Sequence, residues 1–241
     1  AYGRVARGYR AGGFNINPAV PPSEQRFDKE HLWNYELGLR GAATDGRWNA
    51  DLTLFWQERR DMQVRIPLQD ALGDPIAFTF FTDNAAEGRN RGVELQGTLA
   101  VTETISLRGM LGLLDTEVRD FDYQADLEDR DQAHAPKYSF AAGASWNHPT
   151  GWFVEADVSG RDKFYYDFSH DEESESYEVL NLRAGREWGN WSLSAWVRNA
   201  LDEDYAVRGY FFGNEPPAFS PKVYERLGDP RHVGVTVRYT L

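Results

Sequence analysis

Two segments of the sequence gather aromatic and charged side chains of the kind that bind small molecules. Residues 165–175 mix aromatic rings with a dense acidic run, and residues 208–214 set an arginine beside three aromatic rings. Aromatic faces stack on flat ligands, while an arginine attracts an anionic ring through charge pairing and cation–π contact. An anionic aromatic ligand would therefore suit these segments. The candidate ligand-binding residues are Tyr165, Tyr166, Phe168, Arg208, Tyr210, Phe211 and Phe212.

Each segment also has a structural interpretation that involves no ligand. Residues 165–175 would be a solvated loop with aromatic rings at its root, and residues 208–214 would pack against other loops or join an aromatic girdle. The acidic run could bind Ca²⁺, but it lacks the regular Asp-x-Asp-x-Asp-Gly spacing. The sequence leaves the aromatic residues open between ligand contact and packing.

Metal and acid–base chemistry have less support. The five histidines show no metal-ligand spacing, and the absence of cysteine removes disulfides and thiolate sites. Asp167, His170 and Asp171 could form an acid–base group, yet one local cluster in an acidic stretch is a weak signal. We therefore predict no metal site, no cofactor and no enzymatic activity.

The chain around these segments alternates with the period of two that β-strands show. In residues 231–241 every second residue from Val233 to Leu241 is apolar, and the residues between them are charged, polar or small. A strand that is apolar on one face and polar on the other suits the wall of a transmembrane β-barrel. The predicted strands cover residues 1–13, 31–42, 47–65, 76–101, 104–120, 136–147, 151–166, 176–188, 191–199 and 231–241.

The connections between the predicted strands are alternately short and long. Turn-like short connections lie at residues 43–46, 102–103, 148–150 and 189–190. Long connections rich in Pro, Asp, Glu and Asn lie at residues 14–30, 66–75, 121–135, 167–175 and 200–230. Short turns at one end and long loops at the other are typical of an outer-membrane barrel.

Five tryptophans mark the end with the short connections. They lie beside these connections and share the parity of the apolar face of their strands. Because indole rings prefer the level of the lipid headgroups, we predict an aromatic girdle at this end. The five residues are Trp48, Trp146, Trp152, Trp188 and Trp191.

The predicted strand 76–101 breaks the alternation. Its apolar residues occupy even positions up to Phe80 and odd positions from Val93 onward. A bulge or kink near residues 84–90 would reconcile the two parities, because one extra residue moves the following side chains to the other face.

Composition narrows the class of protein further. The 241 residues contain no apolar run near the length of a transmembrane helix, and aromatic residues make up 14% of the chain. The net charge of −12 argues against nucleic acid as a partner. No signal peptide opens the sequence, which begins as if within a strand, so we expect a piece of a longer protein.

Five segments, in their order and spacing, resemble the carboxy-terminal part of a TonB-dependent outer-membrane receptor. They are RGYRAGGFN (7–15), NYELGLR (34–40), NRGVEL (90–95), VRNALDEDY (197–205) and the terminal strand 231–241. The likeness spans nearly the whole chain. Leu241 stands where this family usually ends in an aromatic residue, which we interpret as a mild variant.

The resemblance implies an all-β, antiparallel transmembrane β-barrel of roughly 22 strands, filled by an amino-terminal plug. About ten strands are present, and they would be the last ten. Residues 1–241 would then be the carboxy-terminal portion of the barrel, without the plug domain. The implied function is TonB-dependent uptake of a ferric siderophore across the outer membrane of a Gram-negative bacterium. The implied partners are that ligand, the protein's own plug, TonB (through the missing amino-terminal part) and outer-membrane lipid.

Several alternatives stay open at this point. The cargo could be a glycan or cobalamin, or the chain could form a closed ten-stranded barrel that acts as a pore or protease. A soluble β-sandwich would expose continuous apolar rows to water and is therefore disfavoured. The sequence does not decide whether the outermost strands, 1–13 and 231–241, pair with each other.

Overall fold

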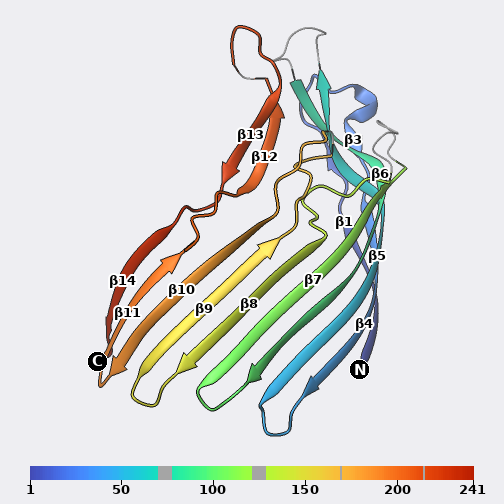
Figure 1. Cartoon of the computed structure of the whole chain (residues 1–241). Helices are drawn as coiled ribbons and strands as arrows, with labels where there is room; N and C mark the ends of the chain where they lie inside the picture. Colours follow the sequence, from blue (N-terminus) through green and yellow to red (C-terminus); the bar gives the residue numbers. More distant parts are fainter. Residues whose placement is uncertain (70–77, 121–128, 169, 214) are drawn as a thin grey trace.

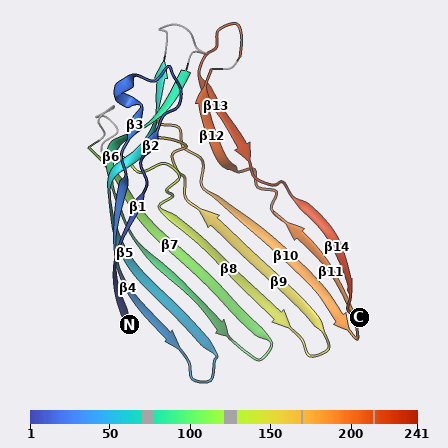
Figure 2. The ribbon, with the colours of Figure 1, turned by 180° about the vertical axis from the view of Figure 1, so that it is seen from behind.

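The computed structural model describes residues 1–69, 78–120, 129–168, 170–213 and 215–241, and its ten long strands form one antiparallel sheet. The sheet is a curved wall of slanted strands, with both chain termini toward the end that carries the short turns (Figures 1 and 2). We call this sheet the strand wall. In spatial order its members are β1 (Tyr2–Arg10), β4 (Glu30–Ala42), β5 (Trp48–Gln69), β6 (Phe78–Ala100), β7 (Ile105–Arg119), β8 (Tyr138–Asn147), β9 (Trp152–Arg161), β10 (Tyr177–Trp188), β11 (Trp191–Arg198) and β14 (His232–Tyr239).

Smaller elements lie at the opposite end, where the long connections are. Two short hairpins pair β2 (Gly13–Phe14) with β3 (Arg26–Phe27) and β12 (Ala206–Phe212) with β13 (Lys222–Leu227). The only helical element among the described residues is the short 3₁₀ turn η1 (Pro22–Glu24). No helix in the described part of the chain is long and apolar enough to cross a membrane.

All ten predicted strands are confirmed, most of them to within a few residues at each end. The prediction of strand up to residue 166 is wrong, because β9 ends at Arg161 and the chain then turns to bury Phe164. The long connection predicted over 200–230 is present, and it contains a hairpin, β12–β13, that the sequence did not predict. Residues 70–77 and 121–128, which belong to the predicted connections 66–75 and 121–135 and to the start of strand 76–101, lie outside the described residues.

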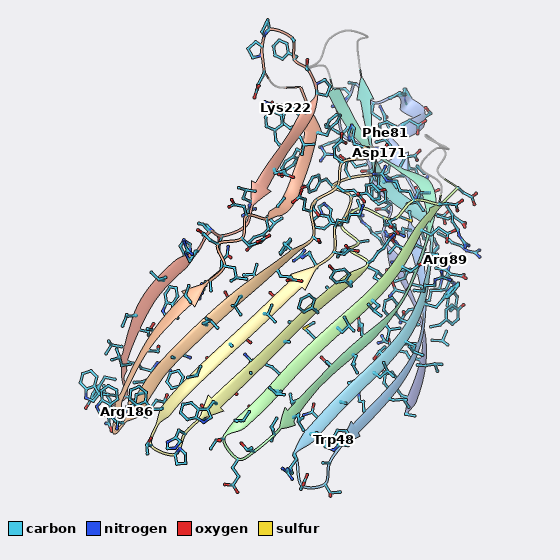
Figure 3. The ribbon with its side chains drawn as sticks, in the orientation of Figure 1. Trp48, Phe81, Arg89, Asp171, Arg186 and Lys222 are labelled. Carbon is cyan, nitrogen blue, oxygen red and sulfur yellow. The ribbon has the colours of Figure 1, made fainter. Side chains whose placement is uncertain are left out.

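The two faces of the strand wall differ as the alternation predicts. On one face the apolar row is exposed along its length, and the predicted tryptophan girdle lies beside the short turns, with Trp48 44% and Trp152 51% exposed (Figure 3). On the other face charged side chains pair between strands. Arg40 Nε lies 2.6 Å from Asp51 Oδ2, and Arg108 pairs with Asp157 across β8.

A glycine makes the second of these pairs possible. Gly143 of β8 lies directly between Arg108 of β7 and Asp157 of β9 in the sheet register. A Cβ atom at this position would overlap both charged side chains, so only glycine leaves the space that the ion pair crosses. A polar face of this kind suits a barrel lumen, and the apolar face suits lipid.

The predicted irregularity near residues 84–90 is confirmed. The pairing of β5 with β6 shifts register between Arg59 and Met62 and again between Met62 and Gln63, opposite Ala86 and its neighbours. Asp61 adopts a φ of 54° at this point. Beyond the bulge the two strands continue as a hairpin that rises above the rest of the strand wall (Figure 1).

The ten strands do not close on themselves. β1 and β14 are the two outermost strands of the sheet, and the described residues of each pair with one neighbour only, β4 and β11 respectively. Both views place these strands at opposite sides of the wall (Figures 1 and 2). The alternative of a closed ten-stranded barrel is therefore wrong for this structure, and the open sheet is the shape of part of a larger barrel.

Candidate ligand-binding site

The long connections fold together above the strand wall rather than extending separately into solvent. A small hydrophobic cluster joins them, and Phe168 packs against it from the β9–β10 connection. We call this assembly, with the rising β5–β6 hairpin and the β12–β13 hairpin, the loop layer. The buried residues of the cluster are Val20, Met62, Val64, Ile66, Phe81, Ala85, Ala86 and Val118. Because they come from four separate parts of the chain, their burial fixes the connections relative to one another.

A buried polar network fixes the β7–β8 connection to the wall. Arg59 donates from Nε and Nη2 to Oε1 of Glu30, at 2.8 and 2.6 Å, and Glu30 is only 6% exposed. Gln132, also buried, accepts from Arg59 and donates to Asn90 Oδ1 at 2.8 Å. Its backbone N–H donates to the Thr116 hydroxyl at 2.9 Å. Buried polar groups that are satisfied in this way impose one arrangement on the segments they join.

One face of the β12–β13 hairpin is docked on the β9–β10 connection. Gly209 lies against the ring of Tyr166, where any Cβ atom would overlap the ring. The Tyr166 hydroxyl donates to Glu225 of β13. Burial, and secondly the Glu225 carboxylate, raise the pKa of Tyr166 far above its ordinary value. Phe211 completes this face, with its ring 4.8 Å from that of His170.

The other face of the hairpin carries cations and aromatic rings toward solvent. Because side chains alternate along a strand, this face consists of Arg208, Tyr210, Phe212, Lys222, Tyr224 and Arg226, and we call it the hairpin face. Arg208 lies 4.9 Å from the Tyr210 ring centroid, and the rings of Phe212 and Tyr224 stack at 4.9 Å. Arg208 stands directly opposite Arg226, and neither has an ion-pair partner among the described residues.

Lys222 adds a third cation at the edge of the hairpin face (Figure 3). It forms an ion pair with Glu215, which raises the pKa of the Lys222 ammonium and lowers that of the Glu215 carboxyl. Its ammonium also lies 5.2 Å from the Tyr224 ring centroid. The face therefore offers stacking surfaces between positive charges, which is the chemistry expected for an anionic aromatic ligand.

The structure separates the seven candidate residues into two groups. Exposed members lie on the hairpin face; these are Arg208, Tyr210 and Phe212. The other four are buried or partly buried within the loop layer; these are Tyr165, Tyr166, Phe168 and Phe211. Tyr166 is only 4% exposed, so in this conformation it supports the hairpin and does not face solvent.

Residues of β13 were not among the candidates, although they complete the hairpin face. Tyr224 and Arg226 lie opposite Tyr210 and Arg208, and residues 222–227 show no regular apolar–polar alternation that would have marked a strand. Arg130 was also missed, and it stacks on Tyr165 across the loop layer, with its guanidinium carbon 3.8 Å from the ring centroid. Because Arg130 and Tyr165 lie far apart in the sequence, no local sequence pattern predicts their contact.

The acid–base candidates lie close together but form no metal centre. His170 Nδ1 is 2.8 Å from Asp167 Oδ2, and Asp171 turns toward Arg130 instead. In the part of the chain that the structure describes, no group of three or more His, Cys, Asp or Glu side chains is arranged to hold a metal ion.

Comparisons with known proteins find β-barrel receptors as relatives over nearly the whole chain. The family model described as "TonB dependent receptor-like, beta-barrel" matches residues 1–200. Among curated proteins, the chain is 23% identical over 230 residues to the metal-pseudopaline receptor CntO of Pseudomonas aeruginosa, covering 93% of this chain and 30% of the relative. It is 25% identical over 244 residues to the pesticin receptor of Yersinia pestis, covering 98% of this chain and 33% of the relative.

Solved structures share the fold at low sequence identity. The ferric yersiniabactin uptake receptor FyuA from Yersinia pestis matches 98% of this chain and 34% of its own, with a TM-score of 0.79 and 22% identity. The siderophore receptor PiuA from Acinetobacter baumannii matches the same shares with a TM-score of 0.71 and 18% identity. The chain thus spans about a third of the length of the relatives it matches.

Proposed function

Because the chain belongs to the TonB-dependent receptor-like β-barrel family, whose members are outer-membrane proteins, we propose that it is the carboxy-terminal portion of a receptor that imports a ferric siderophore. The proposed whole is a barrel of roughly 22 strands, of which the strand wall forms the last ten. A plug domain, encoded before residue 1, would fill its lumen and connect it to TonB.

The hairpin face is the observation that carries the choice of cargo. Two arginines and a lysine surround three aromatic rings at the end with the long connections, and two of these rings, Tyr210 and Phe212, are exposed while Tyr224 is partly buried. Aromatic and catecholate-type iron chelators carry flat rings whose phenolate oxygens are anionic when they bind iron, so stacking and charge pairing would both favour them. The relatives point the same way, since they include receptors named for ferric yersiniabactin and metal–pseudopaline.

The polar face of the strand wall supports the proposed plug. Its ion pairs remain half-exposed, with Arg108 51% and Asp157 41% exposed, so their outer edges are free to bind a second surface. Polar contacts of this kind hold a domain in place yet exchange readily with water, as a plug that must move requires. The work of transport would then be binding and displacement, with no bond made or broken by this chain. Its relatives are likewise named as receptors and transporters.

Binding titrations on the full-length receptor in detergent test this function. Tryptophan quenching would be followed with ferric yersiniabactin, ferric preacinetobactin, ferripyoverdine and a ferric catecholate, the ligand types that the relatives' names supply. We expect saturable quenching by at least one of them. The double variant Y210A/F212A should weaken it by about tenfold or more, because stacked aromatic pairs each contribute about 1 kcal/mol.

Phe14→Ala is the matched control. Phe14 is also an aromatic residue at the end with the long connections, is 73% exposed, and lies outside the hairpin face. It should leave quenching unchanged. No quenching by any ligand would count against a siderophore and direct the search to glycans or cobalamin. Equal losses in Y210A/F212A and F14A would remove the hairpin face from the binding site.

A further inference from the structure

Arg130 is a nearly buried arginine in the loop layer, away from the hairpin face. Its side chain is 9% exposed, and its guanidinium lies flat enough over Tyr165 to bring the central carbon within 3.8 Å of the ring centroid. Nη2 donates to the backbone carbonyl of His170. The backbone of Arg130 is itself fixed, since its carbonyl accepts from Val118 N–H at 2.9 Å. The guanidinium is therefore held by Tyr165 and the His170 carbonyl, and the backbone that carries it is anchored to β7.

The remaining donors of Arg130 are not satisfied. Nε and Nη1 are buried and have no hydrogen-bond acceptor among the described residues. Nη1 lies 3.2 Å from Asp171 Oδ1, but this ion pair lacks the alignment of a hydrogen bond. A guanidinium presents its donors as a rigid fork that fits a carboxylate with two parallel hydrogen bonds. Asp171 thus neutralises Arg130 without filling its fork.

Asp171 is the partner that can leave the ion pair with Arg130. Its side chain is 92% exposed, whereas the arginine that it faces is nearly buried. Withdrawal of the aspartate into water costs that side chain little, provided that a ligand carboxylate replaces it as the counterion of the nearly buried arginine. It would also uncover Nη1 beside the Tyr165 ring, leaving a cation and an aromatic edge next to each other.

We propose that Arg130 and Tyr165 form a carboxylate-binding site, and that Asp171 occupies the place which the carboxylate of an aromatic ligand takes. An incoming carboxylate would bind the fork of Arg130 through two oxygens, and its ring would lie beside Tyr165. The proposal rests on the proposed function and deepens it, since it names a carboxylate on the ligand. It also gives Asp171 the role of an internal competitor.

Benzoate and benzamide are suitable probes, because they have the same shape and differ in charge. Their binding to the full-length receptor in detergent would be measured by saturation-transfer NMR. We expect benzoate to bind and benzamide not to bind. Asp171→Asn should tighten benzoate binding by about fivefold, because it removes a carboxylate that competes with benzoate for Arg130. Arg130→Gln should weaken it by about tenfold or more.

Glu175→Gln is the matched control for Asp171→Asn. Glu175→Gln removes one negative charge from the same segment, as Asp171→Asn does. Glu175 is exposed and has no ion-pair partner among the described residues, so its loss leaves Arg130 unchanged. It should leave benzoate binding unchanged. Because Asp171→Asn is expected to strengthen binding, misfolding cannot imitate the result. Arg130→Lys, which keeps the charge and loses the fork, should fall between wild type and Arg130→Gln.

Three results would overturn the inference: equal effects of Asp171→Asn and Glu175→Gln, weaker benzoate binding in Asp171→Asn, or no binding of benzoate to the wild-type receptor. Its failure is distinct from failure of the proposed function. Benzoate binding that follows the expected order, without quenching by any ferric siderophore, would support this site and reject the cargo. Siderophore quenching without that order would reject only the carboxylate site.

Discussion

The strand wall and the loop layer are stabilised by different kinds of contact. In the wall, ion pairs such as Arg40–Asp51 are partly exposed, with the arginine 71% exposed, and exposed pairs contribute about 0–1 kcal/mol each. Where the loop layer joins the wall, Glu30 is 6% exposed, holds Arg59 by two hydrogen bonds, and through Arg59 holds Gln132 of the β7–β8 connection. The comparison indicates that the wall depends on a repeated pattern, whereas the loop layer depends on individual contacts.

The largest difference is expected from removing one charge in each region. Glu30→Gln should make local opening of the loop layer easier by about 3 kcal/mol, because Arg59 would remain partly buried without its counterion. Asp51→Asn should cost less than about 1 kcal/mol. Hydrogen–deuterium exchange of residues 59–63 and 129–132 in the full-length receptor would report the first change. Similar exchange in the two variants would contradict the comparison.

Within the wall, a charged substitution should destabilise the barrel on the apolar face and not on the polar face. Leu95 is 45% exposed on the apolar face, in mid-strand, and Leu95→Arg should destabilise the barrel by about 2 to 3 kcal/mol by placing a charge in lipid. Gln96→Arg, one residue further on the polar face, should have little effect. Urea titration of the folded receptor, followed by gel mobility, measures both. Equal losses would mean that the two faces are wrongly assigned.

One added methyl group at a glycine should affect the two regions differently. Gly209→Ala should loosen the β12–β13 hairpin by about 2 kcal/mol, because the new Cβ overlaps the Tyr166 ring. Gly8→Ala in the wall adds the same atom where nothing lies within 4 Å. Trypsin cleavage after the exposed Arg208 should become faster in the first variant alone. Unchanged cleavage in Gly209→Ala would show that the hairpin is not docked through this contact.

The smallest effect is expected at the Tyr166 hydroxyl. Tyr166→Phe removes the hydrogen bond to Glu225 and should weaken hairpin docking by about 1 kcal/mol near neutral pH. Burial and Glu225 raise the pKa of Tyr166, so docking favours the neutral phenol. This contribution is present below the ordinary tyrosine pKa of about 10 and is lost as the pH rises above it. Trypsin cleavage of the hairpin across the alkaline range should accelerate in wild type and not in Tyr166→Phe.

Most of the wall followed from residue order alone. Alternation at period two identified all ten strands, the tryptophans located the end with the short turns, and the change of parity between Phe80 and Val93 located the bulge. These are local properties, since each strand must show one face to lipid and the other to the lumen regardless of its neighbours.

The loop layer was predictable only in its composition. The sequence picked out aromatic and charged residues in two connections, but not that Phe211 would pack against His170 while Tyr210 faced solvent. That division depends on which face of the β12–β13 hairpin meets the β9–β10 connection. The strand pattern of 206–212 was concealed because the hairpin lies inside a long polar connection.

By itself, then, the sequence determined the sidedness of the wall and the family resemblance, because both depend on side-chain types at fixed short spacings. Tertiary structure alone decided the contacts of Arg130 with Tyr165 and of Gln132 with Asn90. The physical reason is that a buried group needs a partner, and in the loop layer the partner comes from tens of residues away. Such pairs leave no periodic trace in the chain, and they appear only when the connections are folded onto one another.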